Sequence, residues 1–184
     1  MPEATRRSRP RKIAIDVSVR SSRWTGALPR AAALCRRAAT AAYRNGQGTI
    51  KGAGRAAEAS IVLADDAFVR RLNREYRHVD KPTNVLAFAS LGAGAEPRLP
   101  ARAPWPLGDV VIAYGTATRE AKRLGRTLGD HLCHLVVHGM LHLMGHDHQT
   151  DRAAQAMEKR EVAILAGLGV ANPYGDGRPA RAGK

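Results

Sequence analysis

Six of the seven histidines in this 184-residue chain lie between positions 131 and 148, and three of them have the spacing of metal ligands. His138 and His142 are four residues apart, so on an α-helix they lie one turn apart on one face, where two imidazoles can bind one cation. Gly145 readily adopts the positive φ that ends many helices, and the chain can then turn back and bring His148 to the same ion. We therefore predict a metal site with His138, His142 and His148 as its ligands.

The chemistry of this site follows from the pattern H-x3-H-x2-G-x2-H. It has the spacing of the long zinc-protease signature, but Gly139 stands where that signature carries its glutamate base. Three imidazoles leave one tetrahedral position for water, as in catalytic zinc sites, whereas structural zinc usually has four protein ligands. We expect one Zn²⁺ ion and no further cofactor. Nickel, copper and iron also suit imidazole and stay open as alternatives.

The other histidines of the cluster have a supporting role in this interpretation. His131 and His134 fall on the helical face of His138, and His146 lies beside the third ligand. We expect these three to be structural or to contact the ligands rather than to bind the ion. Asp147 either accepts a hydrogen bond from a ligand imidazole or is a solvated turn residue.

The charge of the chain predicts a polyanionic partner. The formal net charge is +14, of which the first 12 residues carry +4 and the residues after 175 carry +2, so that +8 remains on the body. A basic body with basic ends favours nucleic acid. Only 4% of the residues are aromatic, so a base-stacking platform like that of single-strand binders is not expected.

Length and cysteine content indicate a cytoplasmic protein with one domain. We expect a flexible basic arm at residues 1–12, a single domain at 13–172 and a flexible tail at 173–184. No apolar run reaches the length of a membrane span, and the arginine-rich arm lacks the apolar core of a secretion signal. Cys35 and Cys133 are too few for a disulfide framework and are expected to be reduced.

Hydrophobic periodicity predicts an α+β fold. Four strands are expected at residues 13–19, 60–64, 83–89 and 109–113, with a proline-rich surface loop at 91–106. Helices are expected around residues 28–43, after a cap at Asp65 or Asp66, at 116–124, over the histidine cluster, and after a cap at Asp151. About five helices would then pack a mixed sheet of about four strands, with the metal helix lying across it.

Three blocks of this sequence resemble one known family. Residues 134–148 read HLVVHGMLHLMGHDH, residues 72–88 read LNREYRHVDKPTNVLAF and residues 108–112 read GDVVI. Together they resemble the signatures of the YbeY endoribonucleases, which are bacterial rRNA maturation factors, and the resemblance runs over residues 13–173. The family usually has tyrosine where this chain has His146.

The resemblance implies a zincin-like fold and a single-strand-specific, zinc-dependent endoribonuclease. It further implies a role in 16S rRNA 3′-end maturation and ribosome quality control, with rRNA and the small ribosomal subunit as partners. The metal ligands carry over to His138, His142 and His148, and the family's functional arginine carries over to Arg77. A guanidinium can hold a phosphate through two parallel N–H bonds. From the residues alone, a surface ion pair of Arg77 with Glu75 or Asp80 is the favoured interpretation, and the resemblance reverses this preference.

Two other functions are compatible with the pattern. A zincin-type metallopeptidase has the same helix and glycine spacing, although Gly139 speaks against it. A non-catalytic, ribosome-associated RNA-binding factor with a structural metal would explain the charge without any chemistry. Whether water or the 2′-hydroxyl of the RNA attacks is left open.

Overall fold

A four-stranded mixed sheet forms the centre of the molecule. The computed structural model describes residues 12–46, 55–90, 99–100, 102–146 and 150–175. In these residues the strand order is β1-β2-β4-β3, in which β1, β2 and β4 are parallel and the edge strand β3 is antiparallel to β4. The strands are β1 (Ile13–Val19), β2 (Ala57–Ala64), β3 (Val85–Ala89) and β4 (Trp105–Ala113). The predicted mixed sheet of four strands is confirmed.

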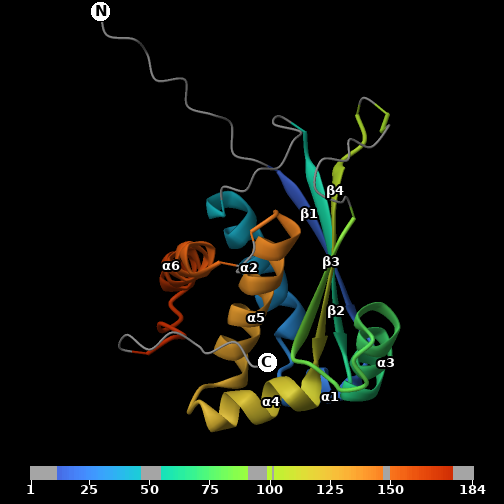
Figure 1. Ribbon diagram of the computed structural model, residues 1–184, viewed down its shortest axis with the longest axis vertical. Helices are drawn as coiled ribbons and strands as arrows, with labels where there is room; N and C mark the ends of the chain where they lie inside the picture. Colours follow the sequence, from blue (N-terminus) through green and yellow to red (C-terminus); the bar gives the residue numbers. More distant parts are fainter. Residues whose placement is uncertain (1–11, 47–54, 91–98, 101, 147–149, 176–184) are drawn as a thin grey trace, which may run out of the picture.

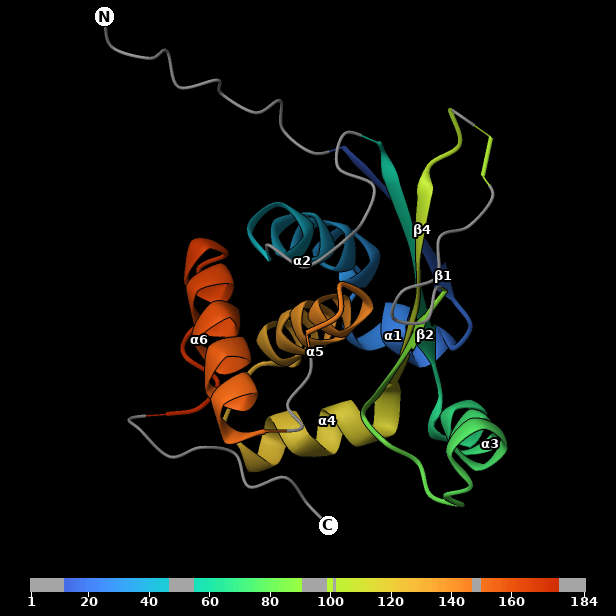
Figure 2. The same cartoon turned by 45° about the horizontal axis from the view of Figure 1, so that its top comes forward.

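Helices cover the two faces of the sheet unequally. The described helices are α1 (Ser22–Ala27), α2 (Ala31–Asn45), α3 (Asp66–Arg77), α4 (Tyr114–Arg123), α5 (Leu128–Leu143) and α6 (Asp151–Gly167). Figure 1 shows α2, α5 and α6 on one side of the sheet, α3 on the other, and α4 at one end. The turned view separates α6, which is the outermost layer, from α5, which lies nearer the sheet (Figure 2). The short helix α1 was not expected, because six residues show little periodicity.

Strand β4 is buried on both faces at its carboxyl end. Val110 and Ile112 belong to the large core between the sheet, α2 and α5, whereas Val111 and Ala113 belong to a smaller cluster beneath α3. This alternation follows from the two-residue period of a strand. Helix α5, which carries the histidine cluster, therefore rests on a strand that is packed on both faces.

Gly139 allows α5 to approach β4 closely. A Cβ atom at this position would lie 2.6 Å from Cγ1 of Val110, which is too close for any real Cβ contact. A side chain at 139 would thus point into the sheet. The glycine that replaces the glutamate of the zinc-protease signature is explained by packing.

The predicted loop at 91–106 is too long at its carboxyl end. Trp105 and Pro106 belong to β4, where Trp105 pairs with Ala57 and Pro106 with Glu58. The register shifts just after Glu58, so that Leu107 is the extra residue of a bulge. Proline lacks an N–H for the ladder and is tolerated at the first residues of a strand and at bulges, which explains how this strand contains one.

The helix starts confirm one cap and correct another. Asp65 caps α3 and accepts a 2.8 Å hydrogen bond from the backbone N–H of Phe68. The predicted cap Asp151 is wrong, because it is the first residue of α6 and Thr150 is the N-cap. The Thr150 hydroxyl accepts a 3.2 Å bond from the N–H of Ala153. Thr150 still has extended backbone angles, as an N-cap requires.

The chain ends are only partly described. Residues 1–11 and 176–184, and with them most of the predicted arm and tail, lie outside the described residues. Pro173 is buried and Tyr174 half-buried, so the chain beyond 172 begins by packing on the domain. Cys35 and Cys133 are free and buried, as predicted. Within the described ranges, no helix is both long and apolar enough to span a membrane.

Candidate metal centre

Helix α5 presents four histidines along one face. The Thr127 side chain caps the helix by accepting from the N–H of Asp130 at 3.0 Å, and Gly145 ends it with a φ of 84°. Successive ring centroids are 6.1 Å apart between His131 and His134, 6.3 Å between His134 and His138, and 4.6 Å between His138 and His142. The predicted helix, its shared face and its glycine stop are confirmed.

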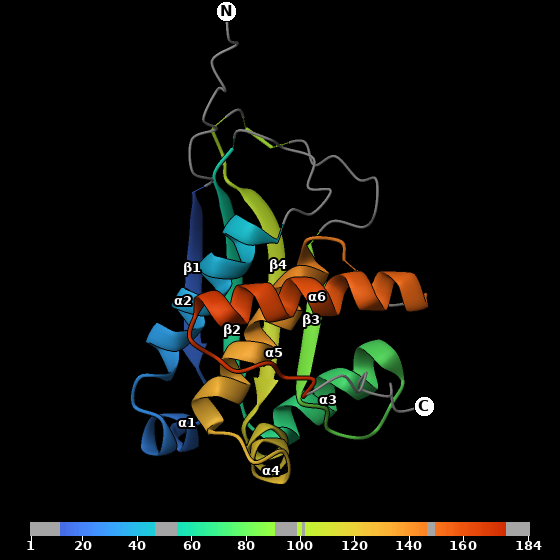
Figure 3. The same cartoon turned by 90° about the vertical axis from the view of Figure 1, so that its left-hand side faces the viewer.

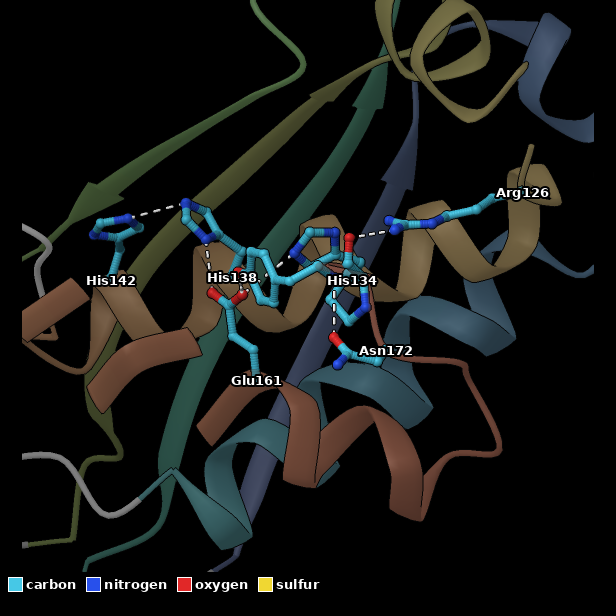
Figure 4. Close-up of polar contacts among 8 residues, drawn as sticks. Arg126, His134, His138, His142, Glu161 and Asn172 are labelled. Atoms are coloured by element: carbon cyan, nitrogen blue, oxygen red, sulfur yellow. Dashed lines mark hydrogen bonds and ion pairs between the residues drawn. The ribbon is translucent and has the colours of Figure 1, made fainter. Parts of the chain in front are cut away.

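His138 and His142 point toward each other at the far end of this row. Their Nε2 atoms are 3.1 Å apart, and both side chains are partly exposed (Figure 4). The rings therefore converge on one point at the surface of α5. This is the arrangement that two imidazoles need if they are to bind one metal ion.

A buried carboxylate on α6 holds two of these rings. Glu161 is fully buried, and its Oε1 accepts a 2.7 Å hydrogen bond from Nδ1 of His138, while Oε2 accepts a 3.2 Å bond from Nε2 of His134. The phenol of Tyr174 also donates to Oε2. Figure 4 shows the carboxylate between the two imidazoles. Glu161 thus links α6, α5 and the C-terminal segment.

The histidines keep this carboxylate ionised. Burial alone raises the pKa of Glu161, but the hydrogen bonds that His134 and His138 donate outweigh burial and lower the pKa to about 2. Burial lowers the pKa of His134, against the opposing effect of Glu161. Burial and the neighbouring carboxylate raise the pKa of Tyr174, so the phenol stays a donor.

The donor set fits a metal ion. A carboxylate can only accept, so the Nδ1 atom of His138 that faces Glu161 carries the proton, and Nε2 keeps its lone pair on the side of His142. This carboxylate and imidazole pairing is typical of metal-bound histidine. The 3.1 Å between the two Nε2 atoms is close to the separation of about 3.3 Å that two nitrogen ligands keep on tetrahedral zinc, given Zn–N bonds of about 2.0–2.1 Å.

The remaining predicted ligand is not placed. His148 and Asp147 lie outside the described residues, and within those residues no three metal-binding side chains converge. His146 is turned away, because its Nε2 donates to the carbonyl of Gly46 at 2.8 Å. Arg160 donates to the same carbonyl at 2.9 Å. This contact ties the end of α5 to the end of α2.

His131 serves a different carboxylate. Its Nε2 donates to Glu120 of α4 at 3.0 Å, and Glu120 also accepts from the amide of Asn84 at 2.9 Å. The imidazole is almost fully buried. This network joins α4, α5 and the start of β3, which agrees with the structural role predicted for His131.

Arg77 lies on the helix that packs on the edge strand from the other side of the sheet. It is the last residue of α3, and the neighbouring ring of Tyr76 meets Phe88 of β3 edge-on at 5.1 Å. Helix α5 packs on β3 from the opposite face. The surface ion pair that we considered is not formed in the described residues, because Asp80 pairs with Arg70 at 2.8 Å.

Sequence reasoning missed Glu161 and Tyr174. A signal for Glu161 was present, since it lies four residues after Met157 and three before Ile164, within the apolar stripe of the last helix. A carboxylate in such a stripe needs a buried partner. Tyr174 carried no comparable signal, because it lies in a segment without periodicity.

Comparisons with known proteins identify the family. The model of the family described as Endoribonuclease YbeY matches residues 31–169. Proteins named Endoribonuclease YbeY match over most of both chains. The one from Paramagnetospirillum magneticum is 48% identical over 89% of this chain and 97% of its own, and that from Azorhizobium caulinodans is 49% identical over 87% and 95%.

A solved structure supports the fold. The solution structure of TM1509 from Thermotoga maritima superposes with a TM-score of 0.52 at 19% identity, covering 92% of this chain and all of that one. At this identity the likeness concerns the fold alone. The family model and the relatives together, over a chain whose histidine helix has the geometry described above, lead to one conclusion: this chain belongs to the YbeY endoribonuclease family.

Proposed function

We propose that this chain is a single-strand-specific, metal-dependent endoribonuclease that acts on rRNA in 16S 3′-end maturation and ribosome quality control. Its partners would be rRNA and the small ribosomal subunit in the cytoplasm. The observation that carries the proposal is the convergence of His138 and His142, with Glu161 fixing one of them. Family membership and the net charge of +14 add support for RNA as the substrate.

In this proposal His138, His142 and His148 hold one zinc ion. When bound, zinc supplies a water of lowered pKa or polarises a phosphoryl oxygen. Glu161 keeps the Nδ1 proton of His138 in place, so that Nε2 stays available as a ligand. Glu161 is itself too buried to reach a substrate, so its task is positioning.

Arg77 is the residue that we assign to phosphate binding. It is exposed, and within the described part of the chain it forms no ion pair that would compete for its guanidinium. Helix α3, which ends in Arg77, and helix α5, which carries the histidines, pack on the edge strand β3 from opposite sides of the sheet (Figure 1). An RNA strand that passes over this edge can meet both. The guanidinium would grip a phosphate bidentately and keep its charge throughout.

The peptidase alternative loses its catalytic base. Gly139 occupies the place of the glutamate in the zinc-protease signature, and a side chain there would point into Val110 of the sheet. Because α5 packs this closely on the sheet, a side chain at position 139 could not point toward a substrate and act as a base. We therefore rank RNA cleavage above peptide cleavage.

The test is cleavage of a defined single-stranded rRNA precursor by protein purified without chelator, with its metal content measured. We expect about one equivalent of zinc per chain and cleavage that chelation abolishes and zinc restores. Arg77→Gln should lose cleavage and retain zinc, with Arg152→Gln, an exposed arginine on α6, as the matched control. If zinc-loaded wild type binds rRNA but never cleaves it, the non-catalytic binding factor is the better description.

A further inference from the structure

The parallel strands β1, β2 and β4 have their carboxyl ends at the same end of the sheet, and the chain continues from them in different directions. Strand β2 leads into α3 on one face, while its hydrogen-bonded neighbour β4 leads into α4, which packs against α5 on the other side. Figures 1 and 3 show α1, α3 and α4 gathered at this end. Open α/β sheets bind ligands in the crevice at such a switch of direction.

Two adjoining hollows open at this end, and neither contains a residue of the candidate metal centre. Their volumes are about 190 and 470 Å³, and both are lined by Asp65 and Ala67 at the start of α3. The first is also lined by Arg20, Phe68 and Arg71, and the second by Arg23, Tyr114 and Arg119.

Three guanidinium groups at these hollows rest on aromatic rings. The Cζ atoms of Arg20 and Arg71 lie 4.5 and 5.3 Å from the centroid of the Phe68 ring, and that of Arg23 lies 4.8 Å from the centroid of Tyr114. The three side chains are exposed. A guanidinium supported in this way loses less side-chain conformational entropy when it binds a phosphate, and its N–H donors still face solvent.

The nearby acidic groups do not neutralise these arginines. Asp65 is occupied as the cap of α3, and Asp66 accepts from the N–H of Thr116 at 2.9 Å and from Arg119 at 2.8 Å. Across the described ranges, Arg20, Arg23 and Arg71 take part in no salt bridge. This leaves three separate positive charges beside the two hollows.

The position of these charges suits a chain of phosphates rather than a single one. Arg71 precedes Arg77 by six residues on α3, which places it about 9 Å away along the helix axis and about 120° around it. A strand whose phosphate is held by Arg77 can wind around α3 to Arg71. It can continue from there to Arg20, which lies against the same Phe68 ring, and to Arg23. Planar guanidinium groups also stack with unpaired bases.

We propose that Arg20, Arg23 and Arg71 form an accessory binding surface for the backbone of single-stranded RNA, outside the metal centre. This proposal rests on the proposed function, because the surface would bind a further part of the same RNA substrate. It holds a flanking part of the strand and takes no part in cleavage.

The test measures binding of a fluorescent, unstructured 12-nucleotide RNA to the full chain in the presence of a chelator, so that nothing is cleaved. Arg20→Gln/Arg71→Gln should raise the Kd about 10-fold and reduce the slope of log K against log salt by about 1.4, since each phosphate contact contributes about 0.7 on single strands. The single variant Arg23→Gln, which leaves Phe68 untouched, should raise the Kd about threefold.

The matched control is Arg36→Gln/Arg44→Gln, which removes two exposed charges from α2. It should change the Kd less than twofold. Equal weakening by both double variants would overturn the proposal, because it would reveal a general charge effect. An unchanged Kd in all variants would overturn it too, as would equal displacement of the RNA by polyglutamate of matched charge.

Cleavage of a trinucleotide too short to reach this surface separates the two proposals. With zinc bound, Arg20→Gln/Arg71→Gln should cleave it at the wild-type rate, and a large loss of rate would contradict a purely accessory role. If no variant and no wild type cleaves any RNA while the binding differences persist, the proposed catalytic function fails and the binding surface stands.

Discussion

The four histidines on the face of α5 divide into two pairs with different surroundings. His131 and His134 are largely buried, and each donates to a carboxylate of another helix. His138 and His142 are more accessible, and their Nε2 atoms face each other at 3.1 Å. The same residue type on the same helical face therefore has two roles, and the neighbouring helices determine which.

Glu161 is the residue that links the two pairs. One of its oxygens accepts from His134 and the other from His138, so it belongs to the packing between helices and to the proposed metal centre at once. Among the four histidines, Glu120 by contrast accepts a hydrogen bond only from His131, a member of the first pair. The division between the pairs can be tested by changing one member of each.

The largest expected effect is that of His142→Ala. Removing one of the three proposed ligands should reduce bound zinc to less than about a tenth of an equivalent and lower cleavage at least about 1000-fold, since the proposed chemistry depends on the ion. The control His131→Ala should retain a full equivalent of zinc. It should lower the free energy of unfolding by about 1–3 kcal/mol, because the partly buried Glu120 loses a donor. Loss of zinc by both variants would remove the distinction between the pairs.

Acid should weaken the zinc-free protein mainly through Glu161. The folded-state pKa of this carboxylate, about 2, lies below its ordinary value of 4.5, so the stability it contributes is complete above pH 4.5 and is lost as the pH falls toward 2. The total is on the order of 3 kcal/mol, at 1.36 kcal/mol for each pKa unit. Urea unfolding between pH 6 and pH 2 measures this loss.

Glu120 provides the comparison for the acid test. Burial raises its pKa, but hydrogen bonds from His131 and Asn84 outweigh burial and lower it, so its contribution is lost in the same direction below pH 4.5. A quarter of its side chain is exposed, and solvent screens the interaction. Glu161→Gln should therefore flatten the pH dependence more than Glu120→Gln. The reverse order would contradict the assignment of Glu161 as the more strongly coupled carboxylate.

Glu161→Gln should also weaken zinc binding about 10- to 100-fold, the usual effect of changing the group that orients a metal-bound histidine. A neutral amide no longer requires the Nδ1 proton of His138, so Nε2 is less often available as a ligand. Competition with a chromophoric chelator measures the affinity. Glu120→Gln, which leaves His138 untouched, should bind zinc as tightly as wild type, and a similar loss in both would argue against tautomer control by Glu161.

The histidine helix could be predicted from sequence because local rules determine it. The four-residue spacing, the cap at Thr127 and the positive φ of Gly145 all act within one turn of chain. The alternation in β1 and the cap at Asp65 are local in the same sense. Such features need no knowledge of the tertiary fold.

The partners of the histidines could not be predicted, because they come from distant parts of the chain. Glu161 is 23 residues from His138 and bonds to it only because α6 packs across α5. The start of β4 was missed for a related reason, since its pairing with β2 outweighs the prolines in its sequence. Tertiary contacts of this kind override local preference.

The smallest effect expected is that of Tyr174→Phe. The variant keeps the ring that packs against His134 at 5.7 Å and removes the hydroxyl that donates to Oε2 of Glu161. We expect a loss of about 1–2 kcal/mol in the free energy of unfolding, because the buried carboxylate loses one of three donors. Zinc affinity should change less than about threefold, since Oε1 still accepts from His138. A drop in affinity as large as that of Glu161→Gln would mean that both oxygens act as one unit, in which case the separation of the two histidine pairs would not hold.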